Sequence, residues 1–330
     1  MSYNHRMPCD LYQLRVFFVL AKTLSFTETA KKLFVTQPAI SQALKKLEES
    51  LGCELIFKRG KQQALTENGT LLYQTCEDIF YRLDKAEESI RRNARDFLGT
   101  IRLGATVEFG NHVLVKNMKK FLDDHENIHV DFVFRHDLLP ALLSDELDVI
   151  VDCRDISDAR LDKKSLFREK YAVVAAPDYL RRHKIRKPKN LEGSRILSLD
   201  RDGTWWERFL LALPEPERPV LANMVEINHL RGIVAAAHDG MGVGLVPRYC
   251  VARELARREL QDVFPEITLL EDHFFIYQKK KKADLEKHRI LVTYLLSIKP
   301  VEFGVAGKRR PYSADDHSAG KGEGVIGRCR

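Results

Sequence analysis

Apolar residues recur at helical spacing through the first fifty residues of the chain. In the stretch 10–24, positions i, i+3, i+4 and i+7 predict an amphipathic helix, and they are occupied by Leu14, Phe17, Phe18 and Ala21. A second, short helix is predicted to follow. Ser25 and Glu28 have the spacing of a capping box, in which each side chain bonds the backbone amide of the other residue.

A third helix carries two opposite stripes. Thr36 is a favoured N-cap, Pro38 suits the first turn and Gly52 ends the helix. Its apolar stripe is Ile40, Leu44, Leu47 and Leu51. Its polar stripe, in antiphase, is Pro38, Ser41, Gln42 and Lys45. Two short helices joined by a tight turn, with hydrogen-bonding side chains early in the second, are typical of a helix-turn-helix that reads the major groove of DNA. The same pattern also fits an ordinary three-helix core with a polar outer face.

A basic hairpin is predicted after the third helix. Residues 55–57 and 64–66 have the pattern of two short strands, and the turn between them contains Lys58, Arg59 and Lys61. Such a wing directs cations toward the sugar-phosphate backbone or the minor groove, whereas a basic hairpin tip on its own is usually a solvated turn. Beside a helix whose Gln42 can pair with adenine and whose Lys45 can reach guanine or phosphate, the wing favours a DNA-binding head.

A long helix with a narrow apolar seam is predicted next. The seam has the 4, 3, 4, 3, 4 spacing of a heptad repeat and consists of Leu72, Cys76, Ile79, Leu83, Ala86 and Ile90. A polar helix with one such seam is expected to pair with a second copy of itself, which would give a dimer with two DNA-binding heads. The alternative is that the seam packs against the chain's own body.

The order of these parts resembles the winged helix-turn-helix and linker helix of LysR-type transcriptional regulators. The resemblance is carried by residues 14–18, 25–33, 36–41, Leu47, Glu48, Leu51, Gly52, Leu55, Phe57, Arg59, Leu65, Thr66 and Gly69. It implies a DNA-binding domain over residues 10–66 and a linker or dimerisation helix over residues 67–95. The side chains that we expect at the DNA are Ser25, Thr27, Thr36, Gln37, Pro38, Ser41, Gln42, Lys45, Lys58, Arg59 and Lys61.

From residue 96 onward, short β-branched or apolar runs alternate with helical patterns. The runs lie at 100–105, 130–134, 149–151, 171–175, 196–199 and 274–277. This alternation predicts an α/β fold with a mostly parallel sheet, in which ligands bind at the carboxyl ends of the strands.

The family resemblance extends into this part of the chain. Residues 103–106, 148–151 and 233–247 look like the effector-binding domain of the same family, which resembles a type 2 periplasmic binding protein. The resemblance implies this domain over residues 96–300, with lobe I at 97–169 and 270–300 and lobe II at 170–269. We expect the chain to cross between the lobes near residues 167–170 and 269–273.

The ends of the predicted strands nominate an effector site between the lobes. Its expected residues are Thr106, Val107, Glu108, Arg135, His136, Asp152, Asp200, Arg201 and Asn228. Each has a simpler explanation, because Thr106 and Asn228 can cap helices and the charged residues can lie in solvated loops. Glu108 in the first helical turn would occupy the positive end of the helix dipole, so we hypothesise that it disfavours a simple carboxylate effector.

The distribution of charged residues indicates that the N-terminal part of the chain is basic. Lys and Arg total 54 against 47 Asp and Glu in 330 residues, which gives a net charge of +7. Residues 1–66 hold 10 of these cations and 5 of these anions, whereas residues 96–300 hold 33 and 32. The positive excess therefore lies mainly in the first fifth of the chain, as expected for a polyanion-binding head on a different kind of body.

Other classes of protein are disfavoured by what the sequence omits. The six cysteines contain no C-x-x-C pair and no nucleophile motif is present, so we expect no metal, no cofactor and no enzymatic activity. No apolar run approaches the ~18 residues that cross a bilayer, and residues 1–10 lack the apolar core of a secretory signal. We therefore expect a cytoplasmic protein without membrane association. Residues 301–330 are rich in glycine and predict a flexible tail.

These patterns together predict a regulator that binds double-stranded DNA and responds to a small-molecule effector. The family resemblance implies a homodimer that assembles into a homotetramer, and contact with RNA polymerase if the protein is an activator. The alternative is a small-molecule-sensing protein whose head contacts other proteins rather than DNA.

Overall fold

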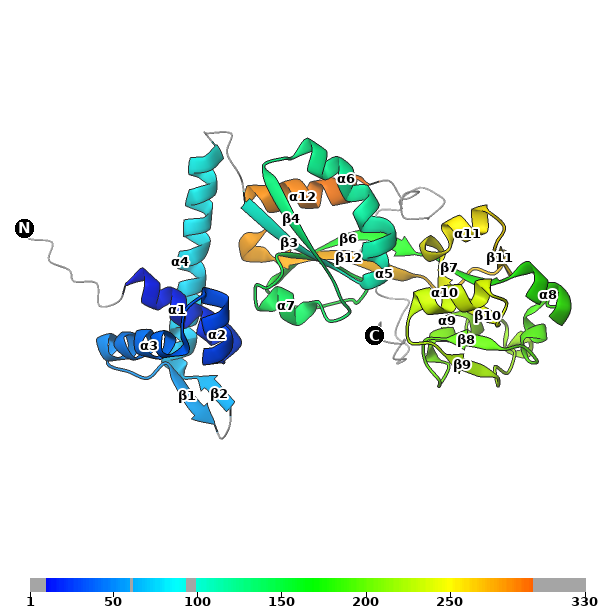
Figure 1. Ribbon diagram of the computed structural model, residues 1–330, viewed down its shortest axis with the longest axis horizontal. Coiled ribbons are helices and arrows are strands. Elements are labelled where there is room, and N and C mark those ends of the chain that lie inside the picture. Colours follow the sequence, from blue (N-terminus) through cyan, green and yellow to red (C-terminus); the bar gives the residue numbers. More distant parts are fainter. Residues whose placement is uncertain (1–9, 60–61, 93–98, 299–330) are drawn as a thin grey trace, which may run out of the picture. The chain divides into compact units, whose positions relative to one another are not determined.

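The computed structural model describes residues 10–59, 62–92 and 99–298, and the chain divides into two units, Met1–Leu98 and Gly99–Arg330 (Figure 1). The tail expected over residues 301–330 and the wing residue Lys61 lie outside the described residues. Among the described helices, none is long and apolar enough to span a membrane.

The first unit is a helical core extended by a hairpin and a long helix. Its elements are α1 (Leu11–Thr23), α2 (Phe26–Leu33), α3 (Gln37–Leu51), the antiparallel strands β1 (Ile56–Arg59) and β2 (Gln62–Leu65), and α4 (Glu67–Arg92). The core contains Leu14, Phe17, Ala21, Ile40, Leu44, Leu47 and Leu55. Their burial removes the apolar face of each helix from water. This hydrophobic effect is the main contribution that holds short helices together. The predicted winged helix-turn-helix is confirmed.

Capping differs from the sequence prediction at two helix starts. Ser25 accepts the N–H of Glu28 at 3.3 Å, but the Glu28 carboxylate bonds Lys31, so half of the predicted capping box is formed. Thr36 occupies the N-cap of α3 without a side-chain hydrogen bond to the helix. A reciprocal capping box exists instead at Asp10 and Gln13, where α1 begins.

The first half of the seam on α4 belongs to the core of its own unit. Cys76 is completely buried, and Leu72 and Ile79 pack against the same core. Assigning Cys76 to a dimer interface is therefore wrong, because the unit's own helices cover that face of α4. The remaining seam residues Leu83, Ala86 and Ile90 are exposed, so only the second half of the seam lies free on this unit.

The start of α4 is fixed to the hairpin by backbone contacts. The Thr66 hydroxyl accepts the N–H of Gly69 at 2.9 Å and donates to the carbonyl of Glu54 at 2.8 Å. A Cβ atom on Gly69 would lie 2.0 Å from the Leu55 carbonyl oxygen. Glycine is therefore required at this position by the close approach of two backbone segments.

The second unit contains two five-stranded sheets. The first sheet has the order β4-β3-β5-β12-β6, with strands β3 (Gly99–Ala105), β4 (Ile128–Phe134), β5 (Val149–Asp152), β6 (Leu161–Glu169) and β12 (Asp272–Lys279). The second has the order β11-β7-β10-β8-β9, with β7 (Tyr171–Ala175), β8 (Ile196–Ser198), β9 (Met224–Glu226), β10 (Val243–Pro247) and β11 (Gln261–Asp262). We call the parts built around these sheets the first lobe and the second lobe.

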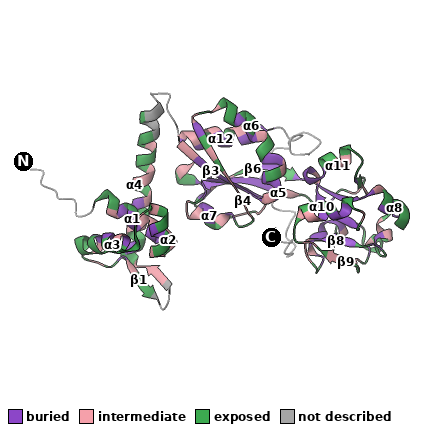
Figure 2. Cartoon of the chain, in the orientation of Figure 1, coloured by how far each residue is buried: buried purple, intermediate pink, exposed green. Residues whose placement is uncertain are grey.

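Helices cover both sheets. In the first lobe they are α5 (Val107–Phe109), the π-helical turn η1 (Gly110–Leu114), α6 (Val115–Asp124), α7 (Leu139–Leu143), the short 3-10 helix η6 (Lys280–Lys282) and α12 (Glu286–Ser297). In the second they are α8 (Pro177–His183), α9 (Glu207–Leu210), α10 (Leu230–His238) and α11 (Ala252–Ala256), with the 3-10 helices η2 (Pro188–Leu191), η3 (Thr204–Trp206), η4 (Glu215–Glu217) and η5 (Arg248–Cys250). Figure 2 shows buried residues concentrated on the strands and exposed residues on the outer faces of the helices.

Both sheets are mixed, which corrects the prediction of a mostly parallel sheet. The strand β12 runs antiparallel to β5 and β6, and β7 runs antiparallel to β10 and β11. The reason lies in the path of the chain, which leaves the first sheet after Glu169 and returns to it at Asp272. The two lobes are thereby joined by two crossing segments, and each sheet receives a strand that runs against its neighbours.

Candidate functional site

The polar stripe of α3 lies on the solvent side of the helix. The residues Gln37, Pro38, Ser41, Gln42 and Lys45 are all exposed. The buried residues of the same helix are Ile40, Ala43, Leu44 and Leu47, whereas Leu51, expected in the apolar stripe, is 37% exposed at the last turn. Lys45 lies 3.8 Å from Glu49, and an exposed pair at this distance holds the ammonium group only weakly. The packing of one face thus presents a row of hydrogen-bonding groups on the other.

Other DNA-contact candidates lie around this helix in the first unit. Thr27 and Thr36 are exposed near the starts of α2 and α3, whereas Ser25 is half-buried and caps α2. Lys58 is exposed on β1. Arg59 ends β1, although its side chain and the whole of Lys61 lie outside the described residues.

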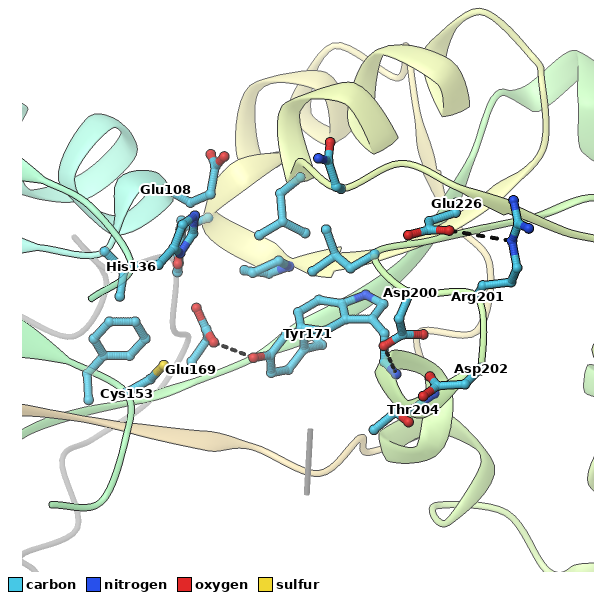
Figure 3. A pocket seen from close by; sticks show the side chains of 18 residues that line it. Glu108, His136, Cys153, Glu169, Tyr171, Asp200, Arg201, Asp202, Thr204 and Glu226 are labelled. Carbon is cyan, nitrogen blue, oxygen red and sulfur yellow. Dashed lines mark hydrogen bonds and ion pairs between the residues drawn. The ribbon is translucent and has the colours of Figure 1, made fainter. Parts of the chain in front are cut away.

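A cavity of about 910 Å³ lies between the two lobes of the second unit (Figure 3). Its walls come from the ends of strands in both sheets, and six of the nine expected effector-site residues line it. These six are Thr106, Glu108, His136, Asp200, Arg201 and Asn228. Thr106 makes no side-chain hydrogen bond as the N-cap of α5, so its hydroxyl is not committed to the helix. The volume is in the range of cavities that hold small molecules.

The other three expected residues do not line this cavity. Val107 is half-buried in the first turn of α5. Arg135 points to Glu146 at 3.4 Å, and Asp152 is fully buried and binds the guanidinium of Arg154 at 2.6 Å. Local ion pairs therefore direct both charged groups away from the cavity. The N-cap of α10 is His229 rather than the expected Asn228.

Asp200 shapes one wall of the cavity. Its carboxylate accepts the N–H groups of Gly203 at 3.1 Å and Trp205 at 2.8 Å, and the Ser198 hydroxyl at 3.1 Å. These bonds fold the segment after β8 into a tight loop that places the Trp205 side chain at the cavity wall. The carboxylate is therefore largely occupied by the protein itself.

A buried cluster of ionisable groups lies where the chain crosses between the lobes. The Tyr171 hydroxyl contacts the carboxylates of both Glu169 and Asp272, the latter at 2.6 Å. Arg208 of the second lobe donates to Asp272 at 3.1 Å, and its guanidinium stacks 4.1 Å from the centre of the Tyr171 ring. Figure 3 shows Glu169 and Tyr171 side by side among the residues that line the cavity. We call Glu169, Tyr171, Arg208 and Asp272 the crossing cluster.

The crossing cluster favours a protonated Glu169. Burial and the nearby Asp272 carboxylate raise the pKa of Glu169 to about 7, against the opposing hydrogen bonds from Tyr171 and Tyr249 and the charge of Arg208. A phenol carries one proton, so the hydroxyl of Tyr171 can donate to only one of its two carboxylate neighbours at a time. A proton on Glu169 would satisfy the second short contact.

Several residues that line the cavity are not among those predicted from the sequence. Glu169 and Tyr171 flank a lobe crossing, and Trp205, Tyr249 and Phe274 supply its aromatic surface. Glu169 and Tyr171 could have been predicted from the crossings expected near residues 167–170 and 269–273, because ligands in a two-lobed protein contact the segments that join the lobes. The aromatic residues could not be predicted as cavity residues, since in the sequence they resemble ordinary core positions.

Replacement of Glu169 by Gln is expected to flatten the pH dependence of the stability of the two-lobed unit. Because the folded pKa is raised, the proton contributes stability that is complete below pH 4.5 and is lost as the pH rises through 7. In the parent protein this corresponds to a fall of roughly 1.4 kcal/mol per pH unit across that window, and Gln has no proton to lose. Urea unfolding can be followed by tryptophan fluorescence, because both tryptophans, Trp205 and Trp206, lie in the second lobe.

Glu226→Gln is the matched control for this measurement. Glu226 also lines the cavity, but it is exposed and lies 3.5 Å from Arg201. The control variant should keep the slope of the parent protein. Parallel stability curves for Glu169→Gln and the parent protein would contradict the assignment.

Two family models match the chain and together span nearly all of its described part. The bacterial regulatory helix-turn-helix protein model of the lysR family matches residues 11–70, and the LysR substrate binding domain model matches residues 94–297. The first match covers the three-helix core and hairpin, and the second covers both lobes.

Individual proteins agree with these matches. The glycine cleavage system transcriptional activator of Escherichia coli K12 is 28% identical over 285 residues, which are 86% of this chain and 92% of the relative. The structure of ArgP from Mycobacterium tuberculosis has a TM-score of 0.63 at 20% identity, covering 87% of this chain and 96% of that one. A full-length OxyR variant from Pseudomonas aeruginosa has the same TM-score and 20% identity, with 88% and 95% covered.

The geometry and these similarities lead to one assignment. A winged helix-turn-helix with an outward polar stripe precedes a two-lobed α/β domain that encloses a ligand-sized cavity. Both parts match models of a single family over more than half of the chain. The chain belongs to the LysR family of DNA-binding transcriptional regulators with an effector-binding domain.

Proposed function

We propose that α3 reads base edges in the major groove and that the hairpin β1–β2 contacts the DNA backbone or minor groove. The observation that carries the proposal is the exposure of every residue in the polar stripe of α3, opposite the buried Ile40, Leu44 and Leu47. The amide of Gln42 can bond adenine in two places, whereas Lys58 supplies a charge without base selectivity. Consistent with this role as a transcriptional regulator, we propose that the protein is not an enzyme and that it acts in the cytoplasm.

Gln42→Ala and Lys58→Ala should have different effects on DNA binding. Loss of the Gln42 amide should reduce discrimination at one base pair by ~1–3 kcal/mol, whereas loss of the Lys58 charge should weaken binding to all sequences alike and lower the salt slope by about 1. A competition assay against single-base variants of the operator, repeated over a salt series, measures both effects. Gln74→Ala, on the exposed side of α4, is a control that should change neither. Unchanged sequence preference in Gln42→Ala would place the groove contact elsewhere.

We also propose a homodimer formed through the second half of α4, with further assembly into a homotetramer. Leu83 and Ile90 are 41% and 73% exposed, and Ala86 lies between them on the same side of the helix. Large apolar side chains aligned at heptad spacing on an otherwise polar helix are unfavourably exposed to water, and pairing with a second copy removes them from it.

Leu83→Glu and Ile90→Glu should each shift the protein from dimer toward monomer. Both positions are exposed on their own unit, so the substitutions add a repulsive charge to the interface and leave the helical core intact. Sedimentation equilibrium measures the change, and circular dichroism checks that helix content is preserved. Gln74→Glu adds the same charge on the opposite side of α4 and should leave the mass unchanged. An unaltered dimer in both seam variants would exclude this helix face.

We further propose that the cavity holds a small effector with a positive charge. Five carboxylates line it, namely Glu108, Glu169, Asp200, Asp202 and Glu226, whereas Arg201 is the one Arg or Lys among its described lining residues. Even with Glu169 protonated and Asp200 engaged by backbone amides, the negative groups exceed the positive ones. Aromatic walls from Tyr171, Trp205 and Tyr249 suit a cation as well.

A thermal-shift screen should therefore favour amines over acids. We expect small primary amines and guanidines to raise the melting temperature of the second-lobe transition, and mono- and dicarboxylic acids of matched size to leave it unchanged. Glu226→Gln should weaken the response, whereas Glu207→Gln on α9, which does not line the cavity, should not. Stabilisation by the acids alone would overturn the assignment of charge.

A further inference from the structure

Three potential metal ligands converge at Glu108, which lines the cavity. Glu108 lies in α5, His112 follows one turn later in η1, and Cys250 ends η5 in the other lobe. One ligand atom of each residue lies within 4.8 Å of the other two. Figure 3 shows the Glu108 side chain at the border of the cavity that it lines.

Glu108 is the residue that demands an explanation. Its side chain is 6% exposed, and its Oε2 atom has no hydrogen-bond partner among the described residues. The His112 Nε2 atom lies 3.4 Å from this oxygen, and the His229 Nδ1 atom lies 3.4 Å from the other oxygen. A buried carboxylate oxygen that accepts no hydrogen bond is costly, so a bound cation would remove a penalty that the fold otherwise bears.

A plain ion pair explains part of this arrangement. His112 and His229 each lie 3.4 Å from one oxygen of Glu108, and on this account Cys250 is an ordinary core thiol. That account leaves unexplained why a thiol, an imidazole and a carboxylate meet at one point from two lobes. The Cys250 thiol is buried, and a coordinated metal would bind it as the thiolate.

We propose that Glu108, His112 and Cys250 bind a divalent transition-metal ion of the Zn²⁺ type. Thiolate, imidazole and carboxylate are the ligands that Zn²⁺ takes in proteins, and tetrahedral bonds of about 2.0–2.3 Å separate ligand atoms by roughly 3.3–3.8 Å. The three ligand atoms lie within 4.8 Å of one another, so small rotamer adjustments would bring them to that spacing. His112 is 21% exposed, which leaves an entry path from solvent.

The ion would connect the two lobes. Glu108 and His112 follow β3 of the first lobe, whereas Cys250 follows β10 of the second, and His229 caps α10 there. Because Glu108 also lines the effector cavity, metal binding and effector binding would be coupled reciprocally. That coupling rests on the proposed effector site, but the binding of the ion does not.

Cobalt titration of the purified full-length protein, stripped with a chelator and kept reduced, tests the site. We expect one Co²⁺ per chain, with visible bands of tetrahedral cobalt and a thiolate-to-cobalt charge-transfer band in the near ultraviolet, all abolished by competing Zn²⁺. Cys250→Ser should lose the charge-transfer band. Cys153→Ser replaces the cysteine that lines the cavity and should keep the charge-transfer band.

His112→Asn guards against the case in which Cys250→Ser does not fold, because His112 is partly exposed and tolerates replacement more readily. It should weaken Co²⁺ binding by on the order of tenfold or more while circular dichroism stays unchanged. Absence of the charge-transfer band in the parent protein, or its loss in Cys153→Ser and retention in Cys250→Ser, would overturn the proposal. These readouts involve neither DNA nor effector, so they are independent of the proposed function.

Discussion

The two lobes of the second unit depend on the buried charges at their crossing. Arg208 and Tyr171 of the second lobe both contact Asp272, which begins the strand that returns the chain to the first sheet. A buried ion pair gives little net stability relative to an apolar core, but removal of one partner costs about 3–5 kcal/mol. Separation of these groups would leave a buried charge without its partner, so the contacts oppose any rearrangement of the crossing that breaks them.

The same logic applies to the DNA-binding head. Buried residues at positions 40, 43, 44 and 47 determine the rotation of α3 about its axis, and that rotation decides which side chains face solvent. If α3 reads DNA as proposed, opposite faces of the same fifteen residues serve stability and recognition. A substitution in the apolar face would then change DNA binding indirectly, because it would turn the polar face.

The sequence predicted the head well because its signals are local. Helical spacing, caps and a basic turn all lie within about sixty residues, and one apolar face per helix leaves little freedom. The two lobes of the second unit are harder to predict. The strand β6 carries charged residues at 162–164 and 168–169, so it lacks the apolar run of a central strand, and β10 is disguised by Gly242 and Gly244. Without β6 and β10, the antiparallel pairs in both sheets could not be anticipated.

Some residues of the candidate site could likewise be predicted from the sequence, and others could not. Strand ends nominated Thr106, Glu108 and Asn228 at the cavity, whereas Arg135 and Asp152 are taken up by neighbours that only the fold reveals. The meeting of Glu108 and His112 with Cys250 follows no sequence spacing, because the lobes bring together segments far apart in the chain. Neither this group of ligands nor the crossing cluster could therefore be predicted from the sequence.

The close approach of Gly69 to Leu55 gives the long helix α4 a mechanical meaning. Since backbone atoms are in contact at this point, the hairpin and the first turn of α4 form one rigid piece. Each residue turns an α-helix by about 100°. The number of residues between Gly69 and Leu83 therefore sets the rotation of the hairpin relative to the exposed seam about the axis of α4. In the proposed dimer, a single inserted residue in that interval would rotate each head by about 100° about the axis of α4 and move it out of phase with its half-site. The length of this stretch, more than its composition, would therefore keep the two heads of that dimer in register.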